Sequence, residues 1–397
     1  MLKTQKNYII DALKDLNFKS LTAIQEAVIP EILKGSDIIA SSKTGSGKSH
    51  AFLIPIFEKL DENHHDLQIV ILSPTRELAT QLYDVASHIA SFSKSTITIG
   101  LYTGGKDRQK EIQSLKSKQP HIVIGTPGKI NDLAFKENVL SVYKAKILVI
   151  DEADMALDIG FLPEIDAIAR VMPKELQMLV FSATIPEKLK PFLRKYLKHP
   201  KEINFEDKSL KDLNLNHTFI RTTENLTKDK ALDDTIKKIN PYLAMIFVNK
   251  KEDVERLYKR LYQEGLNVTM LHGDMPARKR KQVLKEINRL TYQYIVASDM
   301  ASRGLDIEGI SHIINYDLPK DMAFFVHRIG RSGRMGASGD TISFYTDKDN
   351  HALEFIDKHK IDVNFIGNKP IRAIRQSRKS IPSKSTMTRQ KKGRKKQ

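Results

Sequence analysis

The sequence of 397 residues contains no cysteine and no tryptophan. Without cysteine, the chain forms no disulfide, no cysteine-based zinc finger and no thiol nucleophile, and a reducing cytoplasm is the expected compartment. No apolar run approaches the roughly 18 residues of a membrane-spanning helix, and no apolar segment of a secretory signal follows the N-terminal residues MLKTQKN. Because aromatic residues make up only 7% of the chain, an extended surface for stacking on nucleic-acid bases is not expected.

Acidic residues are missing from one end of the chain. From Asn368 to Gln397 there are twelve Lys or Arg residues and no Asp or Glu, so the remainder carries only +5 of the net charge of +17. A basic arm on a nearly balanced body indicates contact with an anionic polymer, and composition favours nucleic acid. The alternatives are a solubilising tail or a localisation signal at Lys391–Lys396.

Short apolar segments alternate with helix-like segments, such as Glu77–Ser91 and Glu187–Leu197, along two stretches of the chain. The candidate strands are Asp37–Ala40, Gln68–Leu72, Thr96–Leu101, His121–Ile124, Ile147–Ile150 and Met178–Phe181, then His217–Arg221, Leu243–Val248, Asn267–Leu271, Gln293–Ala297, His312–Asn315 and Thr341–Tyr345. Such alternation predicts right-handed β-α-β units in parallel, doubly wound sheets. We therefore expect an α/β protein with domains at residues 1–205 and 217–367, a linker at 206–216 and a disordered tail at 368–397.

A glycine-containing loop, SSKTGSGKSH at Ser41–His50, lies between the first candidate strand and an apolar helix. Gly45 and Gly47 let the backbone curl so that its N–H groups point at phosphate oxygens, and the helix N-terminus adds its positive dipole. In a loop of this type, Lys48 reaches the β and γ phosphates and the Ser49 hydroxyl binds Mg²⁺. Serine replaces the first glycine of the strict pattern, and an accidental Gly/Ser loop is the alternative. The position between strand and helix favours phosphate binding.

Three carboxylates, Asp151, Glu152 and Asp154, follow directly after the apolar strand Ile147–Ile150. The carboxyl ends of parallel strands are where α/β sheets collect their ligands. There Asp151 would hold Mg²⁺, and Glu152 would orient and deprotonate the attacking water. A bound metal and the Lys48 ammonium would offset the repulsion among the carboxylates. An acidic helix cap is the alternative, but it does not explain the acid pair combined with a phosphate loop.

These two motifs belong to a longer ordered set, on which the chain resembles the DEAD-box RNA helicases of superfamily 2 from Tyr8 to Ile366. The matching motifs are TAIQ ending at Gln25, SKTGSGKS, PTRELA (Pro74–Ala79), GG (Gly104–Gly105), TPGK (Thr126–Lys129), DEAD (Asp151–Asp154), SAT (Ser182–Thr184), LHGD (Leu271–Asp274), SDMASRGLDI (Ser298–Ile307) and HRIGRSGR (His327–Arg334). The resemblance implies two tandem RecA-like domains, each a parallel sheet flanked by helices, and hydrolysis of ATP with Mg²⁺. The minimal core resembles bacterial members of the cold-shock and ribosome-assembly type.

The resemblance also assigns residues to the nucleotide site. Gln25 would read the adenine edge and Tyr8 would stack on the base, whereas Phe18 is assigned to core packing. Arg331 and Arg334 match arginine fingers in the second domain, so hydrolysis would require the two domains to close. The other candidates for the nucleotide site are Thr44, Gly45, Ser46, Gly47, Lys48, Ser49 and Asp306, and the catalytic set is Lys48, Asp151, Glu152, Arg331 and Arg334.

RNA contacts are implied for small, hydroxyl and basic residues in motifs of both domains. These residues are Pro74, Thr75, Arg76, Gly104, Gly105, Thr126, Pro127, Gly128, Asn249, Gly273, Arg280 and Ser298. Such groups suit the sugar–phosphate backbone and carry no code for bases, so binding would tolerate any sequence and weaken with salt. Asp154, Ser182 and Thr184 resemble the residues that link the nucleotide site to strand separation, with a structural turn as the alternative for the hydroxyl pair.

The sequence therefore predicts an ATP-dependent RNA helicase that closes over RNA, bends it and separates short duplexes while hydrolysing ATP to ADP and phosphate. A non-catalytic RNA clamp or scaffold is one alternative, and its mark would be loss of Lys48, Glu152 or an arginine finger. A DNA translocase on the same core is another. We expect a monomer with no membrane contact that binds RNA in single strands and short duplexes, with ribosome or RNA-decay assemblies as further partners and the tail as an RNA anchor.

Overall fold

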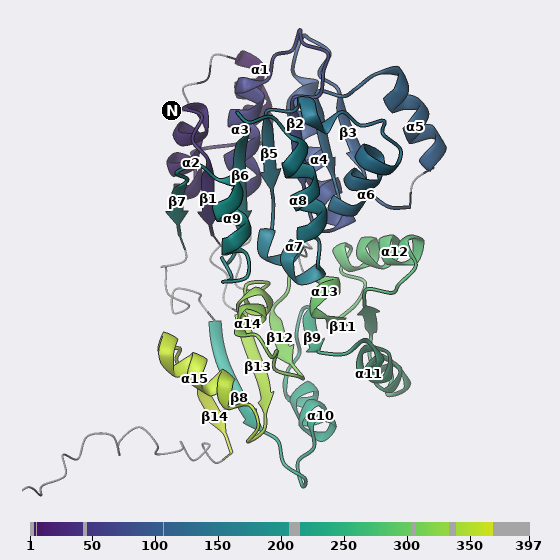
Figure 1. Cartoon of the computed structure of the whole chain (residues 1–397). Coiled ribbons are helices and arrows are strands. Elements are labelled where there is room, and N and C mark those ends of the chain that lie inside the picture. Colours follow the sequence, from purple (N-terminus) through teal and green to yellow (C-terminus); the bar gives the residue numbers. More distant parts are fainter. Residues whose placement is uncertain are drawn as a thin grey trace, which may run out of the picture.

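Two domains follow one another along the chain, and each is built on a parallel sheet of seven strands. The computed structural model describes residues 4, 6–42, 46–105, 107–205, 215–302, 307, 309–332 and 339–367. Figure 1 shows the first domain in purple to teal and the second in green to yellow, with helices around each sheet. The predicted α/β class with two tandem parallel-sheet domains is confirmed. The predicted tail at 368–397 lies outside the described residues.

The first sheet has the strand order β3-β4-β2-β5-β6-β1-β7. Its strands are β1 (Ile38–Ser41), β2 (Ile69–Leu72), β3 (Ile99–Tyr102), β4 (Ile122–Gly125), β5 (Ile147–Ile150), β6 (Gln177–Ser182) and β7 (Lys201–Asn204). The helices are α1 (Asn7–Asp15), α2 (Ala23–Leu33), α3 (Lys48–Lys59), α4 (Arg76–Ser91), α5 (Arg108–Ser117), α6 (Pro127–Asn131), α7 (Ala153–Ile159), α8 (Leu162–Val171) and α9 (Lys190–Tyr196), with short π and 3₁₀ turns at Asp132–Lys136 and Val142–Lys144.

The second sheet has the order β10-β11-β9-β12-β13-β8-β14. Its strands are β8 (Leu215–Arg221), β9 (Ala244–Val248), β10 (Val268–Leu271), β11 (Tyr294–Ser298), β12 (His312–Asn315), β13 (Gly339–Tyr345) and β14 (Asn364–Ile366). The helices are α10 (Lys228–Lys238), α11 (Lys251–Gln263), α12 (Ala277–Asn288), α13 (Asp299–Ser302), α14 (Met322–Ile329) and α15 (Asn350–His359). Strand β8 begins at Leu215, inside the segment predicted as linker.

The central strands are apolar throughout because both faces of each sheet are covered. Along β5, Ile147 and Val149 belong to one apolar cluster and Leu148 and Ile150 to the other, on the opposite face. All twelve candidate strands are found. The edge strands β7 and β14 were missed because their side chains are mostly exposed and form no apolar run. None of the described helices is long and apolar enough to cross a membrane.

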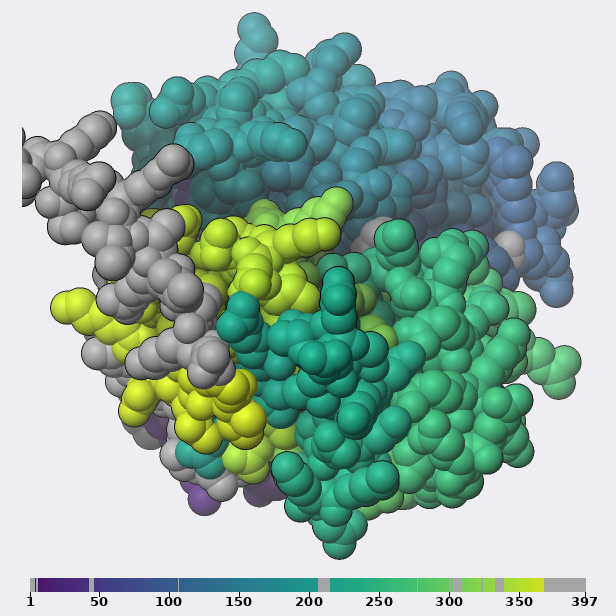
Figure 2. Space-filling model, turned by 90° about the horizontal axis from the view of Figure 1, so that it is seen from below, coloured from purple at the N-terminus to yellow at the C-terminus, as the bar shows by residue number. Residues whose placement is uncertain are grey.

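The boundary between the two domains is where the predicted functional residues gather. Figure 1 shows α13 and α14 of the second domain at the edge that faces α7 of the first. Figure 2 shows the blue and teal surface of the first domain directly beside the green and yellow surface of the second. Among the described residues, Arg280 pairs with Glu77 and His327 contacts Asp154 across this boundary. Side chains of both domains therefore meet at one boundary.

Candidate nucleotide and RNA site

The phosphate-loop candidate follows β1 and leads into α3. Gly47 has a φ of 95°, which favours glycine, and a Cβ there would lie 2.5 Å from the Nε2 atom of Gln25. Lys48, the first residue of α3, is buried, with its Nζ 3.0 Å from the Ser42 carbonyl oxygen and 3.1 Å from Glu152 Oε1. The N-cap residue of α3 is Gly47, which has no side chain to bond the first N–H groups of the helix, and such groups can bind an anion.

The three carboxylates after β5 are buried, and the first two of them, Asp151 and Glu152, interact with Lys48. Asp151 is 5% exposed and Glu152 7%, and Glu152 adopts a left-handed φ of 48°. Burial, and then the negative charge of Glu152, raise the pKa of Asp151 to about 7, while Lys48 opposes the rise. A buried carboxylate with too little positive charge near it suits a cation with oxygen ligands, such as Mg²⁺. The neighbouring hydroxyl of Ser49, in the first turn of α3, fits the same donor set.

Among the described residues, no group of three or more His, Cys, Asp or Glu side chains is arranged to hold a metal ion. Thr44, Gly45, Asp306 and Arg334, which were predicted at this site, lie outside the described residues. Ser46 is described, and its hydroxyl lies 2.8 Å from that of Ser42.

Gln25 connects the start of α2 to the phosphate loop. Its Nε2 donates to the Gly47 carbonyl (3.1 Å), and its Oε1 accepts from the Thr22 N–H (2.9 Å) in a capping box. An amide group offers two donor hydrogens and two acceptor lone pairs, so one of each is left for a further partner. The side chain is 1% exposed. Its place beside Gly47 agrees with the nucleotide site predicted for it.

Tyr8 lies at the other end of α3. Its hydroxyl is 3.3 Å from the Phe57 carbonyl oxygen, and the two rings meet edge to face. Phe57 follows Lys48 by nine residues, roughly 13 Å along the helix. Phe18 instead lies close to the phosphate loop, with its ring centroid 5.5 Å from that of His50, and it also packs against the apolar core. The structure thus brings Gln25, but not Tyr8, to the loop.

Asp154 forms hydrogen bonds with Ser182 and Thr184, the other two residues predicted to link the nucleotide site to strand separation. Its N–H donates to Ser182 Oγ (3.0 Å), and its Oδ2 accepts both the N–H and the hydroxyl of Thr184 (3.0 Å each). His327 Nε2 of the second domain lies 3.4 Å from the same Oδ2 atom. Asp154 and His327 are both buried. The third acidic residue after β5 therefore joins the end of β6 to helix α14.

The RNA candidates that the structure describes follow the carboxyl ends of strands or lie in the helices next to them. Pro74–Arg76 follow β2, Gly104 and Gly105 follow β3, and Thr126–Gly128 follow β4. In the second domain, Asn249 follows β9, Gly273 follows β10, Ser298 ends β11 and Arg280 lies in α12. Because all strands within a sheet are parallel, these residues share one edge of each sheet.

Arg76 and the glycine pair form one feature of the first domain. A Cβ at Gly104 would lie 2.6 Å from Arg76 Nη2, and one at Gly105, whose φ is 90°, would lie 3.0 Å from Nη1. The glycines therefore leave room for the guanidinium. Thr75 caps α4, since its hydroxyl oxygen accepts from the Leu78 N–H (3.2 Å).

Asn249 has its side chain turned inward. The Nδ2 group donates to the Leu318 carbonyl (2.9 Å), and Oδ1 accepts from Arg328 Nη2 (3.0 Å). Arg328 is 1% exposed and also pairs with Asp299, which follows Ser298. The Asn249 amide is thus bonded within the second domain at the end of β9.

Several residues that build the site were not among the sequence candidates. Glu77 pairs with Arg280 Nε at 2.5 Å across the domain boundary, and Arg280 also donates to the Ala301 carbonyl (2.7 Å). Glu111 holds Lys129 at 2.7 Å beneath the start of α6. Glu77 lies inside the motif PTRELA, and His327 is the first residue of HRIGRSGR. Their membership in these motifs was the sequence signal that could have identified them. Arg331 is buried two residues after α14.

Family models match both domains. The DEAD/DEAH box helicase model covers residues 22–192, and the helicase conserved C-terminal domain model covers residues 227–336. The chain belongs to the DEAD-box family of ATP-dependent RNA helicases, and it is an RNA helicase that uses ATP.

Bacterial relatives extend this similarity over most of the chain. The chain is 46% identical over 362 residues to the DEAD-box ATP-dependent RNA helicase CshB of Bacillus subtilis, covering 91% of this chain and 82% of the relative. It is 44% identical to CshB of Staphylococcus aureus, covering 88% and 77%. The predicted resemblance to cold-shock-type bacterial members is confirmed by these relatives.

Solved structures show the same arrangement. The yeast (S. cerevisiae) protein Dbp5 bound to RNA and ADP BeF3 matches with a TM-score of 0.80 at 27% identity, covering 91% of this chain and 93% of that one. Mss116p bound to single-stranded RNA and AMP-PNP matches with a TM-score of 0.80 at 26% identity, covering 92% and 78%.

Proposed function

We propose that this helicase grips RNA across both domains, bends it and separates short duplexes, with ATP hydrolysis reopening the grip. The observation that carries the proposal is the buried contact between Asp154 and His327. It joins the acidic segment after β5 to the second domain, so the ATP-binding residues and the domain boundary are one connected structure. Closure of two domains over a substrate is a common way to assemble a complete catalytic site.

Hydrolysis uses residues of both domains in this proposal. Lys48 leaves Glu152 and moves to the phosphates when ATP binds, because the phosphates offer more negative charge than one carboxylate. Glu152 is then free to orient and deprotonate the attacking water. Arg331 and Arg334 stabilise the charge that develops on the transferred phosphoryl group. The burial of Lys48 and Glu152 supports this exchange, since neither charge has an alternative solvent shell.

Ser49 and Asp151 are the residues proposed to hold Mg²⁺. The ion neutralises phosphate charge when it is bound. The raised pKa of Asp151, to about 7, supports the assignment, because burial beside Glu152 leaves this carboxyl short of positive charge.

RNA contact is proposed through the sugar–phosphate backbone. Arg76, the first residue of α4, has its guanidinium beside Gly104 and Gly105 and supplies it to phosphate oxygens. The other candidates contribute hydroxyls or close approach of the main chain, neither of which reads bases. The basic segment 368–397 is proposed as an additional anchor for RNA of any sequence. We further propose that the protein acts as a cytoplasmic monomer in ribosome assembly, RNA decay or cold adaptation.

The test is phosphate release by the purified full chain with Mg²⁺ and ATP, alone and with an RNA or a DNA oligomer of the same sequence. The proposal predicts strong stimulation by RNA and little by DNA. Equal stimulation by both polymers would favour a DNA translocase. RNA binding without any phosphate release would favour a non-catalytic clamp.

A further inference from the structure

The second domain repeats the topology of the first strand by strand. The first sheet runs β3-β4-β2-β5-β6-β1-β7, and the second runs β10-β11-β9-β12-β13-β8-β14. Each strand of the second sheet thus occupies the place of the strand numbered seven lower in the first. Strand β8 corresponds to β1, which precedes the phosphate loop, and β12 corresponds to β5, which precedes the carboxylates. The segments after β1 and β5, which form the proposed ATP site in the first domain, therefore have counterparts after β8 and β12 in the second domain.

A lysine stands at that counterpart. In the first domain six residues separate the end of β1 at Ser41 from Lys48, the first residue of α3. In the second domain six residues separate the end of β8 at Arg221 from Lys228, the first residue of α10. The two lysines therefore start equivalent helices at equal distances from equivalent strands.

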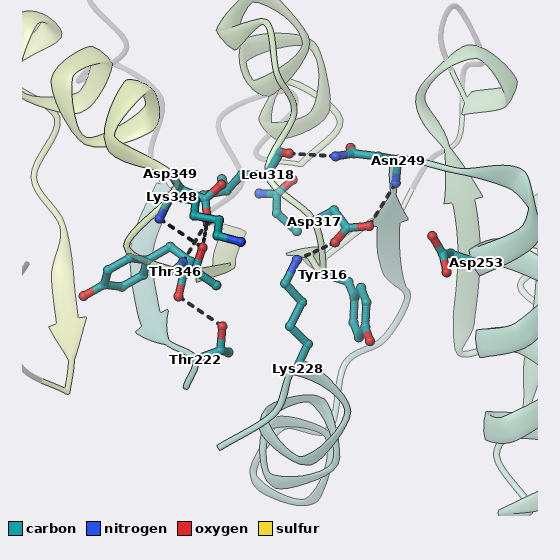
Figure 3. Close-up of polar contacts among 12 residues, drawn as sticks. Thr222, Lys228, Asn249, Asp253, Tyr316, Asp317, Leu318, Thr346, Lys348 and Asp349 are labelled. Atoms are coloured by element: carbon teal, nitrogen blue, oxygen red, sulfur yellow. Dashed lines mark hydrogen bonds and ion pairs between the residues drawn. The ribbon is translucent and has the colours of Figure 1, made fainter. Parts of the chain in front are cut away.

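A carboxylate faces each of these lysines. Lys48 Nζ lies 3.1 Å from Glu152 Oε1, and Lys228 Nζ lies 2.5 Å from Asp317 Oδ1. Asp317 is the second residue after β12, as Glu152 is the second residue after β5. The Asp317 N–H donates to the Phe247 carbonyl (3.1 Å) of β9, the strand that pairs with β12. Figure 3 shows Lys228 reaching from its helix to Asp317.

The counterpart is closed to phosphate. The segment TTENLT between β8 and α10 has no glycine. The Thr223 hydroxyl oxygen stabilises a turn in this segment by accepting from the Leu226 N–H (3.1 Å). The Thr227 hydroxyl caps α10 by accepting from the Lys230 N–H (3.3 Å). An anion would have to displace this cap, whereas the N-cap residue of α3 is Gly47, which has no side chain that could cap the helix. The Lys228–Asp317 pair is therefore an internal contact that no nucleotide replaces.

The pair fixes the end of strand β9. The second carboxylate oxygen of Asp317 accepts the Asn249 N–H (3.1 Å), and the Asn249 side chain donates to the Leu318 carbonyl (Figure 3). The same side chain accepts from Arg328 Nη2 (3.0 Å). Arg328 Nη1 donates to the Asp317 carbonyl at 2.5 Å. One network thus joins Lys228 to RNA candidate Asn249 and to the arginine beside His327, the residue that contacts Asp154 across the boundary.

We propose that Lys228 and Asp317 are positioning residues. They hold the carboxyl end of β9, where RNA candidate Asn249 lies, in a fixed position relative to helix α14. The proposal rests on the RNA-stimulated ATPase proposed above. Neither residue is an RNA or nucleotide contact of the motifs. Their side chains are 29% and 18% exposed, so removal of one charge leaves the other partly buried and unpaired, and Asp317 then shifts relative to Asn249.

The experiment compares phosphate release by wild type, Lys228→Met and Lys230→Met over a range of RNA concentrations. Methionine keeps an unbranched apolar stem over the Tyr316 ring, which Lys228 Nζ approaches to 5.6 Å. Lys230 is exposed on the same helix and serves as the matched control. Lys228→Met should raise the RNA concentration for half-maximal stimulation about three- to tenfold, with the rate at saturating RNA within about twofold of wild type. Lys228→Arg should restore most of the affinity.

Binding of a fluorescent ADP analogue, measured without RNA, should be unchanged by Lys228→Met. Asp317→Asn is a second variant of nearly the same shape, and it should weaken RNA half-saturation in the same direction. Unchanged half-saturation in both folded variants, or an equal change in Lys230→Met, would overturn the proposal. A lowered melting temperature alone, without a change in RNA half-saturation, would also contradict it. If wild type itself shows no stimulation by RNA, the proposed function fails instead.

Discussion

The two domains share a topology and a helix-starting lysine, yet they use that lysine differently. In the first domain a glycine with φ of 95° precedes Lys48 and the helix end is uncapped. In the second domain a threonine precedes Lys228 and caps the helix. In the proposed mechanism the first lysine exchanges its carboxylate partner for phosphate, whereas the second keeps its partner. The difference teaches that the loop, and not the sheet or the ion pair, makes a nucleotide site.

Removal of the proposed base, Glu152 of the first domain, should have the largest effect on activity. Glu152→Gln should bind ATP and RNA but release phosphate about 10²- to 10⁴-fold more slowly, because the amide cannot accept the proton of the attacking water. Stopped-flow phosphate release and RNA anisotropy measure the two properties. The exposed residue Glu175 gives a control, Glu175→Gln, that should behave as wild type. Normal turnover in Glu152→Gln would remove Glu152 from this role.

A glycine in each domain offers a test of the phosphate loop. Gly47→Ala and Gly265→Ala both place a side chain at positive φ, 95° and 83°, but only at Gly47 would the new Cβ meet another side chain, Gln25. We expect Gly47→Ala to weaken ATP binding by at least about tenfold. Gly265→Ala should lower stability by about 1–2 kcal/mol and leave ATP binding unchanged.

Titration with ATP and thermal melts of both variants distinguish the clash from backbone strain. If both variants lost ATP affinity equally, general strain would account for the effect. The contact between Gly47 and Gln25 would then have no part in the nucleotide site.

The cross-domain pair of Glu77 with Arg280 should have a smaller effect. Glu77→Gln removes a contact made only when the domains meet, so RNA-stimulated phosphate release should fall about three- to tenfold. Glu187→Gln removes an exposed pair with Lys190 within the first domain and is the control. Equal rates in both variants would show that closure does not depend on Glu77.

Deletion of residues 368–397 should have the mildest effect. RNA binding should weaken at low salt, and the dependence of log affinity on log salt should become shallower by about 0.7 for each phosphate that the segment neutralises in the full chain. Anisotropy between about 50 and 200 mM salt measures the slope. An unchanged slope would reject the proposal that this segment anchors RNA.

The sequence was sufficient for features that are local in the chain. Each apolar run and each motif lies within a few residues, so the twelve strands and the positions of Lys48, Asp151 and Glu152 could be inferred from spacing and residue type. Gln25 was assigned to the adenine edge by resemblance, and the structure places its side chain against Gly47 of the phosphate loop. These are places where local pattern and fold coincide.

Contacts between distant segments could not be inferred in this way. Glu77 and Arg280 are 203 residues apart in the chain, and no periodicity connects them. Asn249 was a candidate RNA contact by resemblance, and its hydrogen bonds to Leu318 and Arg328, 69 and 79 residues further along the chain, could not be inferred from local pattern. The edge strands β7 and β14 escaped notice because exposed strands carry no apolar pattern.

The most direct test of the account follows the distance between the domains. Because the chain has no cysteine, Glu175→Cys and Glu354→Cys, at exposed positions of the two domains, accept a pair of fluorescent dyes without competition. Energy transfer between the dyes should change to a single new value only when a non-hydrolysable ATP analogue and RNA are both present. A transfer efficiency that stays the same with and without these ligands would contradict the joint closure of the two half-sites.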